Sequence, residues 1–349
     1  MSSDVATSVI SGRGMDPGLM EEWRSLQRSN PDLSSPYFCP EFTACVAAAR
    51  GDVEVAVLRE NRKAVCVFPY QREEPHGGFP VGRPLSDYHG LICAPDFRAD
   101  LKLLLKACSL RTWRYDHLPA SQTAFRSYHS RRACSPVIDV SQGFDRYLKG
   151  VSSQTRECAD ALRKSRRLAG DHGPLAFDYH VPDRALLGML MDWKADQYRR
   201  SGAEDRFAIP WFKQVVINVF QCQAAAFAGV LSVLRAGDVP VALHFGMRAG
   251  GVWHYWFPAY DPRFARYSPG IIMLLKMAEA APSRGIGSID LGKGAAVRYK
   301  EALKSRDVSL AVGCVETPSP DYYWRLLKRR LRAALGRQHS NPGRTPRQR

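Results

Sequence analysis

The sequence predicts an α/β (α+β) chain of two consecutive units, each a mixed, mostly antiparallel sheet flanked by helices. Two observations carry this prediction. Short β-branched runs alternate with longer amphipathic stretches along the chain, and each half repeats the order helix, then hairpin. The 349 residues are also enough for two compact domains with sizeable cores. The shared plan leaves an internal duplication open, although no sequence identity between the halves demonstrates one.

The first unit is predicted over residues 17–140, after a polar, aperiodic segment (residues 1–16) that we expect to be disordered. Its predicted elements are, in order, helices over 19–28 and 41–50, strands over 53–58 and 63–69, a helix over 101–108 and a strand over 112–117. The two strands are separated by the polar Glu60-Asn61-Arg62, which indicates a hairpin.

The second unit is predicted over residues 141–316. Its predicted helices cover 151–169, 184–198, 210–223 and 271–281, and its strands cover 175–179, 230–234, 239–245, 252–257, 288–291 and 308–315. We expect Ser152 or Ser153 to cap the first helix. Three antiparallel strands, two of them joined at Gly237-Asp238, then precede the last helix.

The segment from 252 to 294 is the most informative part of the chain. An apolar strand leads through Ser268-Pro269-Gly270 into an apolar helix, and a second short strand ends in Gly292-Lys293-Gly294. A helix that opens on small residues leaves backbone N–H groups free at the positive end of its dipole, where an anion binds. The alternative is an ordinary turn before a helix, since serine and proline are common there.

Composition indicates a soluble protein, and we expect it in the cytoplasm. No apolar stretch approaches bilayer length, and the N-terminus lacks a secretory signal pattern. The nine cysteines are scattered without a CxxC pair, as reduced core cysteines are, so we expect no metal site. The net charge is +16, but residues 325–349 hold nine Lys or Arg and no Asp or Glu, which leaves +7 for the remaining chain.

The basic charge is therefore mainly a property of the C-terminal segment, residues 317–349. An amphipathic helix is predicted over 321–336, followed by a disordered tail. This helix suits a peripheral contact with anionic lipid at the inner face of the membrane, or with a membrane-bound polysaccharide synthase. A non-catalytic protein that binds nucleic acid or a membrane through this segment is an alternative, although we do not expect a nucleic-acid partner.

The order of these motifs resembles the GNAT acyltransferase superfamily, in particular the branch of FemAB-type peptidoglycan aminoacyltransferases and CelD-type acetyltransferases of bacterial exopolysaccharide or cellulose synthesis. The resemblance spans residues 35–315. It is carried by residues 86–92 (SDYHGLI), 156–167, 241–246 (VALHFG), 267–271 (YSPGI), 289–294 (IDLGKG) and 299–300. It implies two GNAT-like folds side by side, with the acyl donor held by the second.

The resemblance implies an acyl-CoA donor, most simply acetyl-CoA, or aminoacyl-tRNA as in the FemAB relatives. Pro269 departs from the longer glycine-rich phosphate loop of most GNAT enzymes because it has no N–H group. Donor phosphates would then rest on the Ser268 hydroxyl, on backbone N–H groups and on a basic side chain. The residues expected to bind the donor are Arg266, Ser268, Gly270, Ile271, Ile272 and Lys293.

The resemblance further implies direct transfer, in which a base takes the proton of the attacking amine or hydroxyl. Asp290, at the end of a strand beside the donor site, is one candidate for this base. The alternative is a structural role, in which its side chain fixes the loop that follows. Asp87 and His89 are the other candidates, in a glycine-bounded loop that lines an acceptor cleft or forms a structural turn. No Ser-His-Asp or Cys-His spacing indicates a covalent acyl-enzyme.

The remaining candidates would contact the acceptor, namely Tyr88, His244, Trp256, Tyr299 and Lys300. Each has a plainer interpretation: a packed tyrosine, a core histidine, a core tryptophan or a solvated helix lysine. His254 shares a strand face with Val252 and Trp256 and is interpreted as a core residue. The sequence therefore predicts an acyltransferase acting on a small molecule, a sugar or a cell-envelope precursor.

Overall fold

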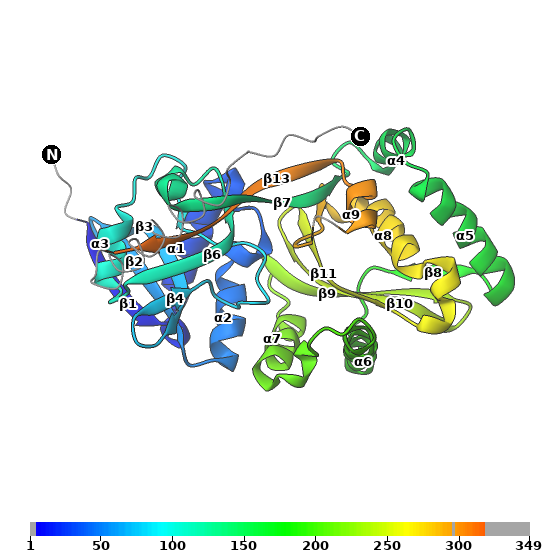
Figure 1. Cartoon of the computed structure of the whole chain (residues 1–349), viewed down its shortest axis with the longest axis horizontal. Coiled ribbons are helices and arrows are strands. Elements are labelled where there is room, and N and C mark those ends of the chain that lie inside the picture. The colour runs from blue at the N-terminus through cyan, green and yellow to red at the C-terminus, as the bar shows by residue number, and fades with distance from the viewer. Residues whose placement is uncertain (1–4, 295–296, 318–349) are drawn as a thin grey trace, which may run out of the picture.

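The computed structural model describes residues 5–294 and 297–317, whose thirteen strands form one continuous sheet (Figure 1). The strands are β1 (Ala6–Ser11), β2 (Val53–Glu60), β3 (Lys63–Glu73), β4 (Gly77–Phe79), β5 (Ile92–Cys93), β6 (Thr112–Pro119), β7 (His129–Asp139), β8 (Leu175–Asp178), β9 (Phe227–Ala236), β10 (Val239–Ala249), β11 (Val252–Tyr260), β12 (Ser288–Asp290) and β13 (Arg306–Glu316). Their order is β1-β2-β3-β4-β6-β13-β7-β12-β11-β10-β9-β8, with β5 beside β3. The mixed, mostly antiparallel sheet predicted from the sequence is confirmed, since β4–β6 and β11–β12 are its parallel pairs among the described strands.

Nine α-helices lie within the described ranges. They are α1 (Pro17–Arg28), α2 (Pro40–Ala49), α3 (Leu101–Ala107), α4 (Phe144–Ser152), α5 (Glu157–His172), α6 (Arg184–Arg200), α7 (Pro210–Gln221), α8 (Pro269–Ala280) and α9 (Arg298–Leu303). In the C-terminal half, α4, α5, α8 and α9 lie on one side of the sheet, and α6 and α7 lie on the other (Figure 1). In the described residues no helix is long and apolar enough to cross a membrane.

The expected disorder of residues 1–16 is wrong from Ala6 onward. Residues 6–11 form β1, which pairs antiparallel with β2 along six consecutive positions. The side chains of β1 are mostly exposed, so the segment carries no hydrophobic pattern that would predict a strand. Its order comes from backbone hydrogen bonds to the free edge of β2, which are invisible in the local sequence.

The helix predicted over 151–169 is divided in two. α4 ends at Ser152, and α5 begins only at Glu157. The intervening Ser153 and Thr155 use their side chains locally: the Ser153 hydroxyl donates to the Gly150 carbonyl (2.7 Å), and the Thr155 hydroxyl accepts from the Glu157 N–H (3.2 Å). Such local bonds compete with helical ones, which explains the break in a helix expected to be continuous.

The two halves are not separate sheets divided near residue 140. β13, from the end of the described chain, lies between β6 and β7, and β12 pairs with β7. Figure 1 shows β7 and β13 extending from one half to the other. The last strand of the second predicted unit therefore completes the sheet of the first.

A shared hydrophobic core joins the two halves on the side of the sheet that α6 and α7 cover. It combines Phe42 of α2 and Tyr88 of the N-terminal half with Phe212 of α7 and Phe245 of β10, all at most 5% exposed. Burying each large aromatic side chain contributes about 1.5–3 kcal/mol, so this contact holds the halves in a fixed relation. The helix predicted over 321–336 lies outside the described residues.

Candidate active site

The centre of the sheet contains a short parallel contact. β11 and β12 pair only at residues 252–254 and 288–290, with His254 beside Asp290. β12 ends there, whereas β11 continues to Tyr260, so the two chains part beyond this point. The residues that follow β12 are held by internal hydrogen bonds, since the Leu291 N–H donates to the Pro136 carbonyl oxygen (2.9 Å) and the Gly292 N–H to Asp290 (2.8 Å). α8 begins on the connection between the two strands.

Asp290 lies at this parting point and is only 4% exposed. Its Oδ1 accepts hydrogen bonds from the Ser135 hydroxyl (2.6 Å) and from the Gly292 N–H (2.8 Å). Its Oδ2 accepts a short hydrogen bond from the Tyr88 hydroxyl. Asp290 therefore pins the glycine loop and also receives a phenolic proton donor from the other half of the chain.

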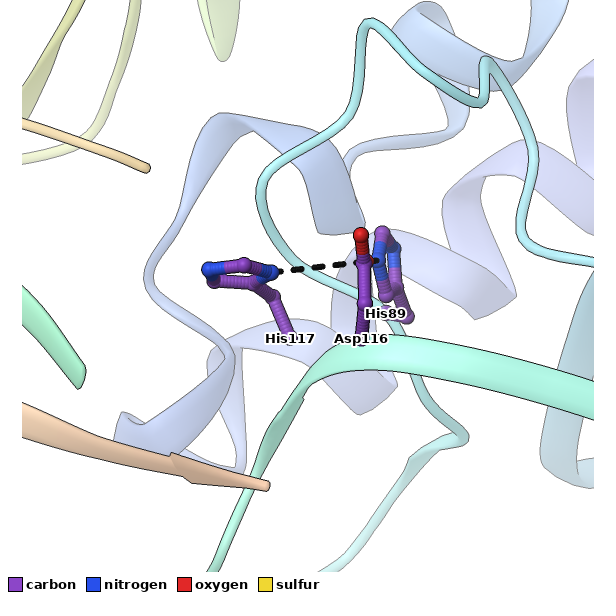
Figure 2. A group of neighbouring side chains, drawn as sticks. All are labelled: His89, Asp116 and His117. Carbon is purple, nitrogen blue, oxygen red and sulfur yellow. Dashed lines mark hydrogen bonds and ion pairs between the residues drawn. The ribbon is translucent and has the colours of Figure 1, made fainter. Parts of the chain in front are cut away.

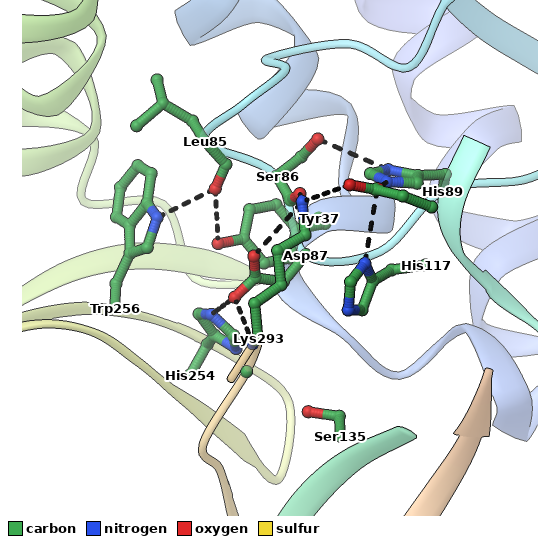
Figure 3. Close-up of polar contacts among 12 residues, drawn as sticks. Tyr37, Leu85, Ser86, Asp87, His89, His117, Ser135, His254, Trp256 and Lys293 are labelled. Atoms are coloured by element: carbon green, nitrogen blue, oxygen red, sulfur yellow. Dashed lines mark hydrogen bonds and ion pairs between the residues drawn. The ribbon is translucent and has the colours of Figure 1, made fainter. Parts of the chain in front are cut away.

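Asp87 and His254 form a second buried contact (Figure 3). His254 Nε2 is 3.2 Å from Asp87 Oδ2, and its Nδ1 is 3.7 Å from Asp290 Oδ1. The Lys293 N–H donates to Asp87 Oδ2 (3.1 Å). Burial alone would raise the pKa of Asp87, but the contact with His254 and the charges of His254 and Lys293 lower it below its ordinary value.

His89 belongs to a neighbouring polar group with Asp116 and His117 (Figure 2). His89 Nε2 is 2.6 Å from Asp116 Oδ1, and His117 Nδ1 is 3.3 Å from the same oxygen. Burial lowers the pKa of His89 to about 4, against the opposing effect of Asp116, so the ring is neutral at pH 7. Because its Nε2 is already in hydrogen-bond contact with Asp116, this nitrogen is not available to a substrate.

These three side chains also have the geometry of a possible metal site, since one ligand atom from each lies within 4.8 Å of the others. The sequence predicted no such group. However, Lys293 Nζ is 3.3 Å from Asp116 Oδ2, so an ammonium already supplies positive charge at this carboxylate. Asp116 is thus contacted by both histidines and by the Lys293 ammonium.

A cavity of about 380 Å³ opens beside Tyr88 and Asp290. Its wall is built from both halves: the 31–35 segment after α1, the end of β6, the start of β13, and Val252 and Ser288 at the start of the parallel pair. A cavity of this size holds a small ligand. Tyr88 and Asp290 thus line a space that an acceptor molecule can enter.

The residues predicted to bind the donor divide between two places. Ser268 precedes α8 with φ of +55°, and its hydroxyl accepts a hydrogen bond from Lys164 Nζ of α5 (2.7 Å). Gly270, Ile271 and Ile272 form the first turn of α8. Arg266 is nearby and pairs with Asp171 at 3.7 Å.

Lys293, by contrast, points to the N-terminal half. Its Nζ donates to the Ser86 carbonyl oxygen (2.7 Å) and pairs with Asp116. Lys293 therefore belongs with Asp87 and His89 at the junction of the halves, where the first turn of α8 contributes none of its contacts.

The candidates for acceptor binding are all at least partly buried. Lys300 is 9% exposed, and its Nζ donates to the carbonyl oxygens of Leu291 (2.5 Å) and Lys293. The interpretation of Lys300 as a solvated lysine is therefore wrong. Trp256 Nε1 donates to the Leu85 carbonyl oxygen (3.0 Å), which ties β11 to the loop before Asp87.

His244 and Tyr299 lie on the α8 side of the sheet. The His244 ring is fully buried and stacks on Tyr255 at 4.7 Å, and burial lowers its pKa far below the ordinary value. Neither of its ring nitrogens has a hydrogen-bond partner in the described part of the chain. Burial also raises the pKa of Tyr299 to about 12, against a hydrogen bond with Tyr255.

Sequence reasoning missed two members of the central group. His254 was interpreted as a core residue, and Ser135 belongs to β7, a strand that was not predicted. The register of β11 against β12 is what brings His254 beside Asp290. The only local signal was a histidine at the same strand face as Trp256, two positions away.

Comparison with known proteins identifies a domain in the second half of the chain. Residues 156–301 match the family model described as "Acetyltransferase (GNAT) domain". The protein is an acyltransferase. The matched residues include β11, α8 and β12 and end in α9, so the parting strands, the start of α8 and Asp290 all lie inside the domain.

Two solved structures resemble the whole chain in fold. FemX shares 10% identity at a TM-score of 0.63 and covers 93% of this chain and 100% of its own. The tandem GNAT protein from the clavulanic acid biosynthesis pathway shares 9% identity at a TM-score of 0.50 and covers 90% and 100%. Both likenesses support the tandem GNAT-like fold.

A third structure, the C-terminal domain of a putative lysylphosphatidylglycerol synthetase from Agrobacterium fabrum, shares 11% identity at a TM-score of 0.52 and covers 89% and 95%. No curated protein matches the sequence.

Proposed function

We propose that the protein transfers an acyl group from acyl-CoA to an amine or hydroxyl of an acceptor bound in the 380 Å³ cavity. The observation that carries this proposal is the hydrogen bond from Tyr88 to Asp290, because both residues line that cavity and Asp290 is the last residue of the β11–β12 pair before the strands diverge. A hydroxyl that contacts the acceptor on one side and a carboxylate on the other can carry a proton from the acceptor to the carboxylate.

The donor phosphates bind at the first turn of α8. The Gly270 N–H has no partner among the described residues and is the donor left for an anion, because the Ile271 and Ile272 N–H groups donate to the Ser268 carbonyl oxygen (3.0 and 3.3 Å). The helix dipole also favours negative charge there. Lys164 adds a positive charge, since its Nζ is already bonded to the Ser268 hydroxyl at 2.7 Å. Pro269 contributes no N–H donor at the first helical position, and the Lys164 ammonium replaces that missing donor to the phosphate.

The transfer is direct. The acceptor nitrogen or oxygen forms a bond to the thioester carbonyl carbon, and the bond from that carbon to sulfur breaks, so CoA leaves as the thiolate with the bonding electron pair. The proton of the nucleophile passes to Tyr88 Oη as the Tyr88 proton passes to Asp290 Oδ2. Asp290 then returns its proton to the thiolate or to solvent.

The acceptor belongs to the sugar or cell-envelope precursor class, as the resemblance to CelD-type enzymes implies. An aminoacyl-tRNA donor is the alternative. It is favoured by the likeness to FemX over the full length of both chains and by the net charge of +16. An aminoacylated tRNA would make many phosphate contacts, so its affinity would fall steeply as the salt concentration rises. The affinity for acyl-CoA, which has few phosphates, would depend only weakly on salt concentration.

A thermal-shift and calorimetry series tests the donor. Acetyl-CoA and CoA are each titrated into the wild-type protein and into Lys164→Gln, with aminoacylated tRNA and uncharged tRNA as parallel ligands. We expect stabilisation by acetyl-CoA that Lys164→Gln weakens. Stabilisation by charged tRNA alone would replace acyl-CoA by the aminoacyl-tRNA alternative.

A further inference from the structure

The sign of the charge in the cavity differs from that of the chain. The chain carries +16, yet the cavity is lined by three aspartates and one arginine. Arg306 is 3.9 Å from Asp139, and Asp307 pairs with Lys304 at 2.7 Å, so these charges are largely balanced. Asp290 and Asp32 remain, and no basic side chain among the described residues pairs with Asp32.

Asp290 and Asp32 occupy different depths of the cavity. Asp290 is buried beside Tyr88, whereas Asp32 is exposed in the 31–35 segment. Two carboxylates in one cavity repel an anionic ligand and attract a cationic one. The cavity is thus unsuited to the phosphate or carboxylate groups of an acceptor, and suited to an ammonium group.

The cavity also presents hydroxyl groups without partners. Within the described residues, the side-chain hydroxyls of its five serines make no hydrogen bond to other protein atoms: Ser34, Ser35, Ser121, Ser288 and Ser309. Ser34, Ser121 and Ser309 are exposed and Ser288 is partly exposed, so a ligand can reach these four residues, whereas Ser35 Oγ is buried below the surface. A ligand with several polar groups would exchange the water on these serines for hydrogen bonds of its own.

The rest of the wall is apolar. It is formed by the rings of Pro31 and Pro119 and by the side chains of Val137, Val252 and Val308. A wall of unpaired hydroxyls and carboxylates facing aliphatic groups matches a ligand with many hydroxyls on one side and C–H groups on the other.

We propose that the acceptor is a hydroxylated primary amine of the amino-sugar or amino-alcohol class, bound without phosphate or carboxylate groups. This inference rests on the proposed function and specifies its substrate. The amine lies at Tyr88 and Asp290, and the hydroxyls bond to the serines and to Asp32. The ammonium loses one proton to solvent on binding, and the neutral amine attacks the acyl carbon as described above.

Four probes of similar size test each part of this assignment. They are glucosamine, glucose, cyclohexylamine and glucosamine 6-phosphate, each offered with acetyl-CoA while thiol release is measured. We expect glucosamine to give a kcat/KM at least tenfold above each of the others, which lack the amine, lack the hydroxyls or add a phosphate. A preference for glucose, cyclohexylamine or the phosphorylated probe would overturn the assignment.

Two variants link the preference to the cavity. Asp32→Asn, which removes the negative charge, and Ser288→Ala, which removes a partly exposed hydroxyl, should each raise the KM for glucosamine about tenfold and should leave the KM for acetyl-CoA unchanged. Asp238→Asn, in the exposed turn between β9 and β10, is the matched control and should change neither. Equal kinetics for the cavity variants and the control would place the acceptor elsewhere.

Failure of this inference can be told apart from failure of the proposed function. If acetyl-CoA binds but none of the four probes accelerates thiol release, the acceptor class is wrong and the acyl-CoA donor stands. If acetyl-CoA does not bind, the donor is wrong. In that case ligand-observed NMR measures the binding of glucosamine to the wild-type protein and to Asp32→Asn. Weaker binding to Asp32→Asn would support the proposed acceptor class, and equal binding to the two proteins would contradict it.

Discussion

The Tyr88 hydroxyl donates a hydrogen bond to Asp290 Oδ2 across the junction between the two halves of the chain, 202 residues apart in sequence. Tyr88 comes from the loop before β5, and Asp290 ends β12. Because both side chains line the same cavity, each half supplies one member of the proposed proton path. Neither half alone contains this pair, so the junction between them is part of the site.

Removing either member of this pair should slow transfer. Tyr88→Phe keeps the ring and removes the proton donor, and Asp290→Asn removes the proton acceptor. We expect kcat to fall about 10²–10⁴-fold in each, with little change in the Kd for acetyl-CoA. The measurement is steady-state thiol release, with circular dichroism to establish that the fold is intact.

The double variant sharpens this prediction. If the two groups act as one unit, Tyr88→Phe with Asp290→Asn should be about as slow as either single variant. Tyr128→Phe, a partly buried tyrosine outside the cavity, should keep wild-type kcat. Fully multiplicative losses would show that Tyr88 and Asp290 act independently and would remove the proton relay.

Donor binding should depend on Lys164. Its Nζ is 2.7 Å from the Ser268 hydroxyl at the start of α8, so Lys164→Gln should raise the Kd for acetyl-CoA by about tenfold. Arg163→Gln is the matched control, because Arg163 is the preceding residue on the same helix, points to solvent and pairs with Asp160. Calorimetry that finds the same Kd for both variants would move the phosphate site away from α8.

Most helices and strands were predictable because their hydrophobic patterns are local. The strand at 252 and the helix after Ser268 are continuous apolar runs that are buried over most of their length, and the structure places both, and the strand at 288, close to their predicted bounds. β7 was missed because its first half, His129 to Ala133, carries polar and exposed side chains. The strand is ordered by pairing with β13, about 175 residues later in the chain.

The predicted site residues come together in part. Asp290 and the Asp87-Tyr88-His89 loop were found from strand ends and glycine-bounded turns, and the structure joins them. His254 was not found, because its contact with both carboxylates depends on strand register rather than on spacing. Whether the acceptor cavity is acidic was also unpredictable, since Asp32 and Asp290 are 258 positions apart in the chain.

The glycine loop should tolerate no side chain at Gly292. Gly292 has φ of +66°, and an added Cβ would lie 2.3 Å from Asp87 Oδ2 and 2.8 Å from the His254 ring. Gly294→Ala is the matched control, because Gly294 has φ of +90° but its Cβ would meet only ordinary contacts, the nearest at 3.5 Å.

Both substitutions strain the backbone by about 1 kcal/mol. Gly292→Ala should lose about 1–3 kcal/mol more in the free energy of unfolding, because it also displaces Asp87 and His254. Urea unfolding measures the difference, and thiol release should fall sharply only in Gly292→Ala. Equal stability and activity for the two variants would show that the loop moves to accommodate a side chain.

Acid should destabilise the protein through His89. Burial holds the pKa of His89 at about 4 in the folded state, against 6.5 for an ordinary histidine. Well above pH 6.5 the ring is neutral in both the folded and the unfolded state, so it adds no pH dependence to the free energy of unfolding. Between pH 6.5 and 4 only the unfolded chain takes up the proton, so stability falls with decreasing pH by at most about 1.4 kcal/mol per pH unit.

Urea unfolding at pH 7.5, 6.0 and 5.0 tests this dependence. His89→Gln should flatten the fall between pH 6.5 and 5, whatever its effect at pH 7.5, while His76→Gln, at an exposed site, should keep the wild-type slope. Some slope should remain in His89→Gln, because burial also lowers the pKa of His244. An unchanged slope in His89→Gln would mean that the His89 ring takes up its proton in the folded state, and that the Asp116 carboxylate outweighs burial at this position.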